Sequence, residues 1–154
     1  MFRLDHMKHL LIMRHGQAVV SGTSDADRKL TSLGEVQVRK QASVLRDCLP
    51  DVIISSPVRR AIQTADLIVD ELGFSGKREI WRDLVPSGKP EAIVELLALT
   101  EGDNLMVISH QPLVSRLVHS LTGHDTPFQE SQICLLAKGE MDILNVRKIY
   151  LPDA

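Results

Sequence analysis

The sequence has few of the features that mark secreted or membrane-spanning proteins. Its two cysteines, Cys48 and Cys134, are far apart and form no paired motif, so a disulfide framework is not expected. No apolar run approaches the roughly 20 residues that span a bilayer. Charged residues and histidines interrupt residues 1–9 too often for a signal peptide, and either Met1 or Met7 could be the natural start. We therefore expect a cytoplasmic protein that has no contact with a membrane.

Features typical of nucleic-acid-binding proteins are also scarce. Aromatic residues make up 3% of the chain and the formal net charge is −2, so neither stacking platforms nor a generally basic surface is expected. A length of 154 residues with 44% hydrophobic and 25% charged residues is typical of one globular domain. We therefore expect a single domain over residues 1–154, no nucleic-acid partner, and any anion site to be local.

Short apolar runs alternate with helical patterns along the chain. The runs at 10–13, 52–56 and 105–109 predict buried strands, and two closing strands are expected at 133–137 and 143–150. Helices are expected over 30–49 and 57–72 and from about 92 and 112, whereas 74–90 reads as irregular with a short extended piece at 79–81. This alternation predicts an α/β fold with a largely parallel sheet covered on both faces. The predicted core includes Val38, Ala42, Leu45, Leu49, Met106 and Met141.

Three of the predicted strands end in polar residues that suit an anion. The first run ends in Arg14-His15-Gly16, the second is followed by Ser56-Pro57 and by Arg59-Arg60, and the third ends at His110. Ser56 and Pro57 suit the N-cap and first position of a helix, whose free N–H groups favour an anion. If the three strands are neighbours, these groups converge at one edge of the sheet.

Arginines and histidines without a carboxylate cluster suit a dianionic phosphoryl group. Guanidinium groups bind phosphate oxygens bidentately, and a neutral imidazole nitrogen is a competent nucleophile. The other ring nitrogen must then be held as a donor, which a nearby backbone carbonyl can do. These residue types predict that His15 takes up a phosphoryl group while Arg14 holds its charge.

Four motifs resemble those of the histidine phosphatase superfamily, also called phosphoglycerate mutase-like. The stretch 14–18 is similar to its opening Arg-His-Gly motif, 30–34 to LTxxG, 56–65 to SPxxRAxQTA, and 108–110 to its third element. The resemblance implies a three-layer αβα sandwich with a mostly parallel central sheet. It also implies that His15 becomes phosphohistidine and that Arg14, Arg60 and His110 bind the phosphoryl oxygens. Arg60 fills the motif's arginine position, and adjacent helical residues point about 100° apart, so Arg59 is expected at the rim.

One departure from the family pattern concerns the general acid. Many members carry a glutamate where this sequence has Pro86, and proline donates no proton. The short chain and its Leu-x-Pro-x-Gly stretch resemble the small SixA-type phosphohistidine phosphatases. That resemblance implies a phosphorylated protein substrate, such as a histidine phosphotransfer domain, and no cofactor or metal. An imidazole is a better leaving group than an alkoxide, which fits a missing acid. Asp83 could replace the acid, although a solvated loop residue is the simpler interpretation.

Other functions remain open at this stage. A phosphatase of small phosphate esters would use the same residues, a mutase would need a lid to exclude water, and a binding module could use the fold without catalysis.

His6 and His9 lack further ligands for a metal site, and His119 and His124 are expected at the surface. Trp81 is expected to pack rather than to bind a ligand. The charged stretch 25–29 is either solvated or in contact with a protein partner. The oligomeric state is not specified, and a monomer is the simplest expectation.

Overall fold

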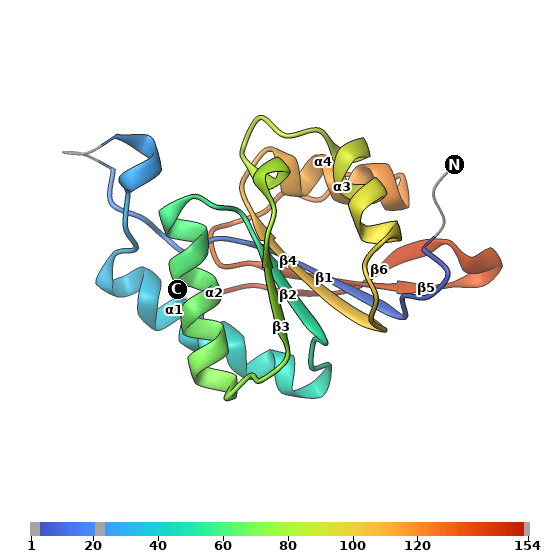
Figure 1. The fold of residues 1–154 in the computed structure, drawn as a ribbon, viewed down its shortest axis with the longest axis horizontal. Helices are drawn as coiled ribbons and strands as arrows, with labels where there is room; N and C mark the ends of the chain where they lie inside the picture. The colour runs from blue at the N-terminus through green and yellow to red at the C-terminus, as the bar shows by residue number, and fades with distance from the viewer. Residues whose placement is uncertain (1–3, 21–23, 153–154) are drawn as a thin grey trace.

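The central element of the fold is a six-stranded sheet with the strand order β3-β2-β4-β1-β5-β6 (Figure 1). The computed structural model describes residues 4–20 and 24–152, so the alternative start at Met1 and part of the loop predicted after Gly16 lie outside the described residues. The strands are β1 (His9–Arg14), β2 (Val52–Ser55), β3 (Lys77–Ile80), β4 (Asn104–Ser109), β5 (Ile133–Lys138) and β6 (Leu144–Tyr150).

The sheet has a parallel part and an antiparallel part. The neighbours β3 and β2, β2 and β4, and β4 and β1 pair in parallel. The last two strands, β5 and β6, add to the β1 edge in antiparallel orientation. The mostly parallel sheet predicted from the alternating pattern is therefore confirmed.

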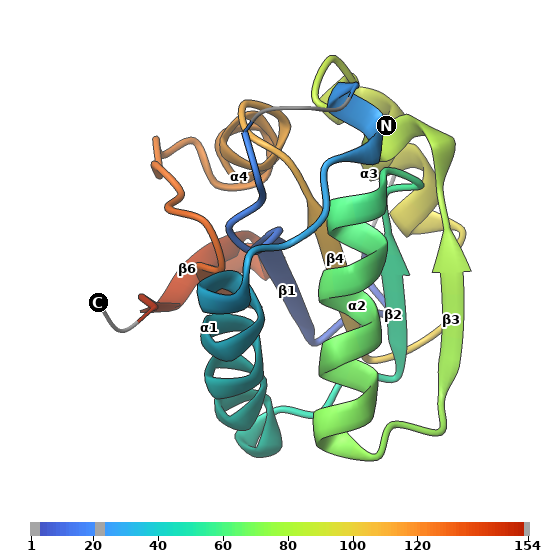
Figure 2. The ribbon, with the colours of Figure 1, turned by 90° about the vertical axis from the view of Figure 1, so that its left-hand side faces the viewer.

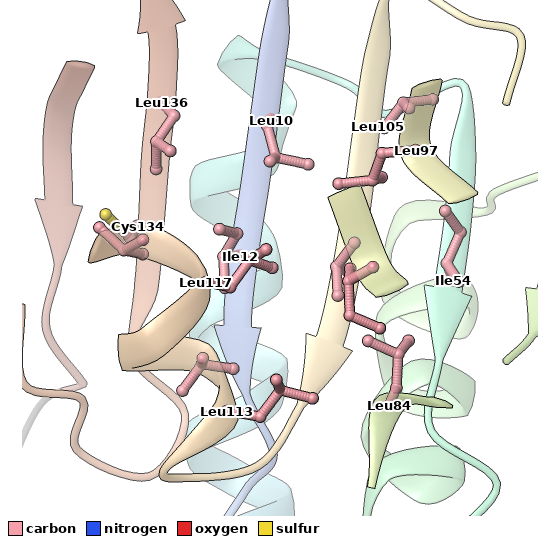
Figure 3. Packing of buried hydrophobic residues seen from close by; sticks show 14 of the residues in the cluster. Leu10, Ile12, Ile54, Leu84, Leu97, Leu105, Leu113, Leu117, Cys134 and Leu136 are labelled. Atoms are coloured by element: carbon pink, nitrogen blue, oxygen red, sulfur yellow. The ribbon is translucent and has the colours of Figure 1, made fainter. Parts of the chain in front are cut away.

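Helices cover both faces of the sheet and complete three layers. The four α-helices are α1 (Ser32–Ala42), α2 (Arg59–Leu72), α3 (Pro90–Ala98) and α4 (Leu113–Thr122). Figure 2 shows α1 and α2 side by side on one face, where a core cluster includes Leu11, Val38 and Ile68. On the other face, Leu113 and Leu117 of α4 lie against the strands (Figure 3). No helix in these described parts of the chain is long and apolar enough to cross a membrane.

Several predicted boundaries were wrong. The helix expected over 30–49 ends at Ala42 and continues as a 3-10 helix, Ser43–Asp47, so the helical spacing is lost and Leu49 is 53% exposed. The helix expected from Pro57 begins at Arg59, because Val58 is the N-cap and its backbone is extended. The irregular stretch 74–90 contains the edge strand β3, which begins two residues before the extended piece expected at 79–81 and ends one residue before it. Met141 is 89% exposed and does not belong to the core.

Candidate active site

The sheet topology brings the three predicted strand exits together. Strands β2, β4 and β1 are consecutive neighbours and run parallel, so their carboxyl ends lie at one edge of the sheet. Arg14 is in register with Ser109, and Ser55 with Ile108. His15, Ser56 and His110 each follow these ends directly. The structure thus gathers all four predicted site residues, His15, Arg14, Arg60 and His110, around one point.

His15 lies in this site as a buried and oriented imidazole. Its side chain is 5% exposed, and Nδ1 lies 2.7 Å from the carbonyl oxygen of Gly16. A carbonyl only accepts, so Nδ1 carries the proton and donates, which leaves the lone pair on Nε2. Burial lowers the pKa of His15 to about 4, opposed by the Gly16 hydrogen bond and assisted by the cations of Arg60 and Arg14. At neutral pH, His15 is therefore an uncharged imidazole with Nε2 available as a nucleophile.

Arg60 faces the nucleophilic nitrogen from the first turn of α2. Its Nε–H donates to Nε2 of His15 at 3.2 Å, and its Nη1 donates to the backbone oxygen of Asp25 at 2.9 Å. Its Nη2 also lies 3.3 Å from the carboxylate of Asp25. Arg59 is exposed instead and donates to the backbone oxygen of Asp27 at 3.1 Å. The two adjacent arginines thus point in different directions, and Arg60 alone of the pair faces His15.

Arg14 approaches the site from the end of β1. Its Nη1 donates to the backbone oxygen of Phe128 at 2.9 Å, which fixes the guanidinium group against the segment before β5. Its Nε is buried and has no hydrogen-bond partner among the described residues. Since a buried donor without a partner costs free energy, this N–H group is a candidate donor to an anion.

His110 is the second buried imidazole. It is 1% exposed, and its ring centroid lies 5.0 Å from that of His15 at an interplanar angle of 57°. Nε2 lies 2.8 Å from the hydroxyl oxygen of Ser56, whereas Nδ1 is buried without a partner among the described residues. Burial, His15 and Arg60 together lower the pKa of His110 to about 3. The site therefore combines two neutral imidazoles with two guanidinium cations.

Residues that the sequence analysis did not single out hold the backbone of the site. The hydroxyl of Thr64 accepts from the N–H of Gly16 at 3.0 Å and donates to the carbonyl of Arg60 at 2.7 Å. A side chain at Gly16 would collide with Val38, because its Cβ would lie 2.6 Å from Cγ2. Thr64 lies four residues after Arg60 in the helical motif, so the helical spacing was a signal that could have found it.

A second support comes from the C-terminal part of the chain. The N–H of Ser131 donates to the carbonyl oxygens of both Arg14 and His15, at 3.1 and 3.0 Å. Gln41 of α1 holds this segment in turn, since its amide donates to the carbonyls of Ser131 and Tyr150 at 2.8 and 2.7 Å. No local sequence pattern predicts such contacts, because they join residues about 90 to 120 positions apart.

Among the remaining candidates from the sequence, the structure brings Asp25 into contact with this group. Asp83 is exposed, whereas Asp25 of the charged stretch contacts Arg60 directly. Nδ1 of His9 donates to the side-chain amide oxygen of Asn104 at 2.8 Å, and no cluster of three or more metal-binding side chains occurs in residues 4–20 and 24–152. As expected, His119 and His124 are at the surface, and Trp81 packs against the core.

Comparisons with known proteins identify a matching family and several relatives. Residues 10–85 match the family described as the histidine phosphatase superfamily, branch 1. The phosphohistidine phosphatase SixA of Escherichia coli K12 is 37% identical over 123 residues, which cover 77% of this chain and 76% of that protein. The SixA homolog of Haemophilus influenzae is 30% identical over 131 residues, with 77% and 80% covered. A solved structure of the protein histidine phosphatase SixA complexed with tungstate has a TM-score of 0.84 and 32% identity, covering 94% and 97% of the two chains.

Proposed function

This chain belongs to the histidine phosphatase superfamily, and on that premise we propose that it hydrolyses phosphohistidine in a phosphorylated protein in the cytoplasm. The reaction passes through a covalent phospho-His15 intermediate. The observation that carries the proposal is the pair of contacts on the His15 ring. Gly16 fixes the proton on Nδ1, and Arg60 places a donor 3.2 Å from Nε2, where a phosphoryl group would bind.

The first step transfers the phosphoryl group to His15. The lone pair of Nε2 forms a bond to phosphorus while the P–N bond of the substrate breaks, and the electron pair leaves with the substrate imidazole. Arg14, Arg60 and His110 bind the phosphoryl oxygens and stabilise the charge. The leaving imidazole departs neutral when its other nitrogen carries a proton. It then needs no protein acid, which agrees with Pro86 standing where many relatives carry glutamate.

The second step hydrolyses phospho-His15. Water attacks phosphorus opposite Nε2, the P–N bond breaks, and the electron pair returns to Nε2. The proton of the water leaves with the phosphate product. Gly16 keeps the proton on Nδ1 throughout, so His15 returns to the tautomer in which it started.

The substrate class follows from the relatives and from the open side of the site. Two relatives that are at least 30% identical are named for phosphohistidine, which supports a protein histidine as the phosphoryl donor. The residues beyond Arg60, including Arg59 and the Asp25 carboxylate, are exposed and leave space for a macromolecular surface. A histidine phosphotransfer domain is a substrate of this type.

The test compares phosphate release from a phosphohistidine protein and from a panel of phosphomonoesters in the presence of a chelator. We expect preferential turnover of phosphohistidine, and loss of about four orders of magnitude or more in His15→Ala, as is typical for a removed nucleophile. The exposed His124 provides a matched control, and His124→Ala should keep wild-type turnover. Faster turnover of a small ester would replace the proposed substrate, and full activity of His15→Ala would contradict the intermediate.

A further inference from the structure

Ser56 contacts His110 of the active site, and no role in the reaction has been assigned to it above. It is fully buried, follows β2 directly, and its backbone N–H donates to the carbonyl of Ile108 at 3.0 Å. Its hydroxyl oxygen accepts from the N–H of Val58 at 3.1 Å and lies 2.8 Å from Nε2 of His110. The side chain is therefore fixed on two sides, and one of its two partners is a residue of the site.

The hydrogen bond between Ser56 and His110 has two possible directions, and they differ in what they leave unsatisfied. If Nε2–H donated to the hydroxyl, the hydrogen of Ser56 would have no acceptor and Nδ1 would present a lone pair beside the anion site. If the hydroxyl donates to Nε2, the Ser56 hydroxyl hydrogen and the Nε2 lone pair are both satisfied, and Nδ1 carries the ring proton. Nδ1 is buried without a partner among the described residues, in a ring whose centroid lies 5.0 Å from that of His15. A donor there matches the guanidinium donors around it.

We propose that Ser56 is a positioning residue, whose hydroxyl donates to Nε2 of His110 and so keeps the ring proton on Nδ1 to meet a phosphoryl oxygen. The expected effect of Ser56 on turnover rests on the proposed function. The predicted tautomer of His110 does not depend on it. The two imidazoles of the site are then set in the same way, with the proton on Nδ1. His15 carries its lone pair on Nε2 because a carbonyl holds its Nδ1, and His110 offers an N–H at Nδ1 because a hydroxyl holds its Nε2.

The first measurement is the tautomer of His110 in the wild-type protein, by long-range ¹H–¹⁵N NMR correlation of the ring nitrogens. We expect one protonated nitrogen, Nδ1, and one unprotonated nitrogen, Nε2. Inorganic phosphate should shift the Nδ1–H resonance as it accepts the hydrogen bond. Protonation on Nε2 in the wild-type protein would overturn the proposal, whatever the substrate is and however the variants fold.

The second measurement compares Ser56→Ala with Ser56→Thr and with a matched control at the preceding residue. The control is Ser55→Ala, since Ser55 is 2% exposed and its hydroxyl has no partner among the described residues. Loss of a buried hydrogen bond should lower kcat/KM of Ser56→Ala roughly 10- to 100-fold. Its His110 should become a mixture of tautomers. Ser56→Thr keeps the hydroxyl and should keep the wild-type tautomer, and Ser55→Ala should match the wild type in both respects.

The outcomes separate this proposal from the proposed function. A wild-type protein that does not hydrolyse phosphohistidine would refute the function, while the tautomer would still decide the role of Ser56. An unchanged tautomer in folded Ser56→Ala would refute the positioning role while leaving the function intact. Equal losses in Ser55→Ala and Ser56→Ala would assign the effect to packing and would also overturn the proposal.

Discussion

The site has a buried floor and an exposed rim, which are built differently although Arg60 of the floor contacts Asp25 of the rim. The floor, which we define as His15, Arg60 and His110, is at most 5% exposed, and each of its side chains has a fixed partner. The rim, which we define as the 3-10 helix Asp25–Asp27 (η1) and Arg28, contains no buried residue, and the Asp25 side chain is 69% exposed. Burial in the floor fixes protonation and direction, whereas solvent at the rim weakens its ion pairs.

This difference indicates where the chemistry is determined. The floor sets the nucleophile and its charge, so changes there should affect every substrate. The rim holds Arg60 through Asp25 without reaching the imidazoles, and a phosphate would compete with that carboxylate for the guanidinium group. Changes at the rim should therefore alter binding more than turnover.

The largest expected effect separates two adjacent arginines. Arg60→Ala removes a floor donor and should lower kcat/KM about 100- to 1,000-fold, the usual cost of removing one donor to a transition-state oxyanion. Arg59→Ala removes an exposed side chain that contacts only the Asp27 carbonyl among the described residues, and should stay within about threefold of wild type. Steady-state kinetics on the phosphohistidine protein check both values. Comparable losses in the two variants would show that the buried Arg60 and the exposed Arg59 do not differ in their contribution to turnover.

An intermediate effect concerns stability at acidic pH. The pKa of His15 falls from an ordinary 6.5 to about 4 in the fold, so the unfolded chain binds a proton that the folded protein excludes. The stabilising contribution is complete above pH 6.5 and is lost as the pH falls toward 4. Between pH 7 and 5, we expect His15 to account for about 2 kcal/mol of the lost unfolding free energy.

Urea unfolding of the wild type and of His15→Asn at both pH values measures this contribution. The variant should lose less stability between pH 7 and 5 than the wild type. His124→Asn, which changes an exposed histidine, should reproduce the wild-type pH dependence. Identical pH dependence in His15→Asn and the wild type would show that the floor does not exclude the proton.

The smallest effect is expected at the rim. Asp25→Asn removes the carboxylate that competes for Arg60 and should lower KM for the phosphorylated protein about two- to fivefold, since an exposed ion pair contributes at most about 1 kcal/mol. kcat should stay unchanged. Asp27→Asn removes a charge from the same turn without touching Arg60 and serves as the matched control. A large fall in kcat in Asp25→Asn would place this residue in the floor.

The sequence predicted those site residues that a local sequence pattern indicates. Arg14, His15 and His110 stand where apolar runs stop, and Arg60 follows from its motif position. Their convergence was predicted on the condition that the three strands are neighbours, and the observed strand order meets that condition. The predicted residues were correctly gathered, but their catalytic roles stay predictions until they are measured.

The rest depended on contacts that no local pattern encodes. Ser56 was interpreted as a helix cap, yet α2 begins later and the hydroxyl serves His110 as well as the Val58 N–H group. The sequence predicts that Asp25 lies in a charged stretch that is either solvated or in contact with a protein partner, and only the folded chain brings it to Arg60. Leu49 was placed in the core because its spacing assumed an α-helix where a 3-10 helix follows Ala42.

The support given by Ser131 also has a consequence for synthesis on the ribosome. His15 is synthesised well before Ser131, whose N–H group donates to the carbonyl oxygens of Arg14 and His15, and Gln41 ties Ser131 to Tyr150 at the end of β6. At about 5–20 residues per second, the nucleophile waits several seconds or more for these partners. A nascent chain therefore carries His15 for some time before the contacts that hold the His15 backbone can form.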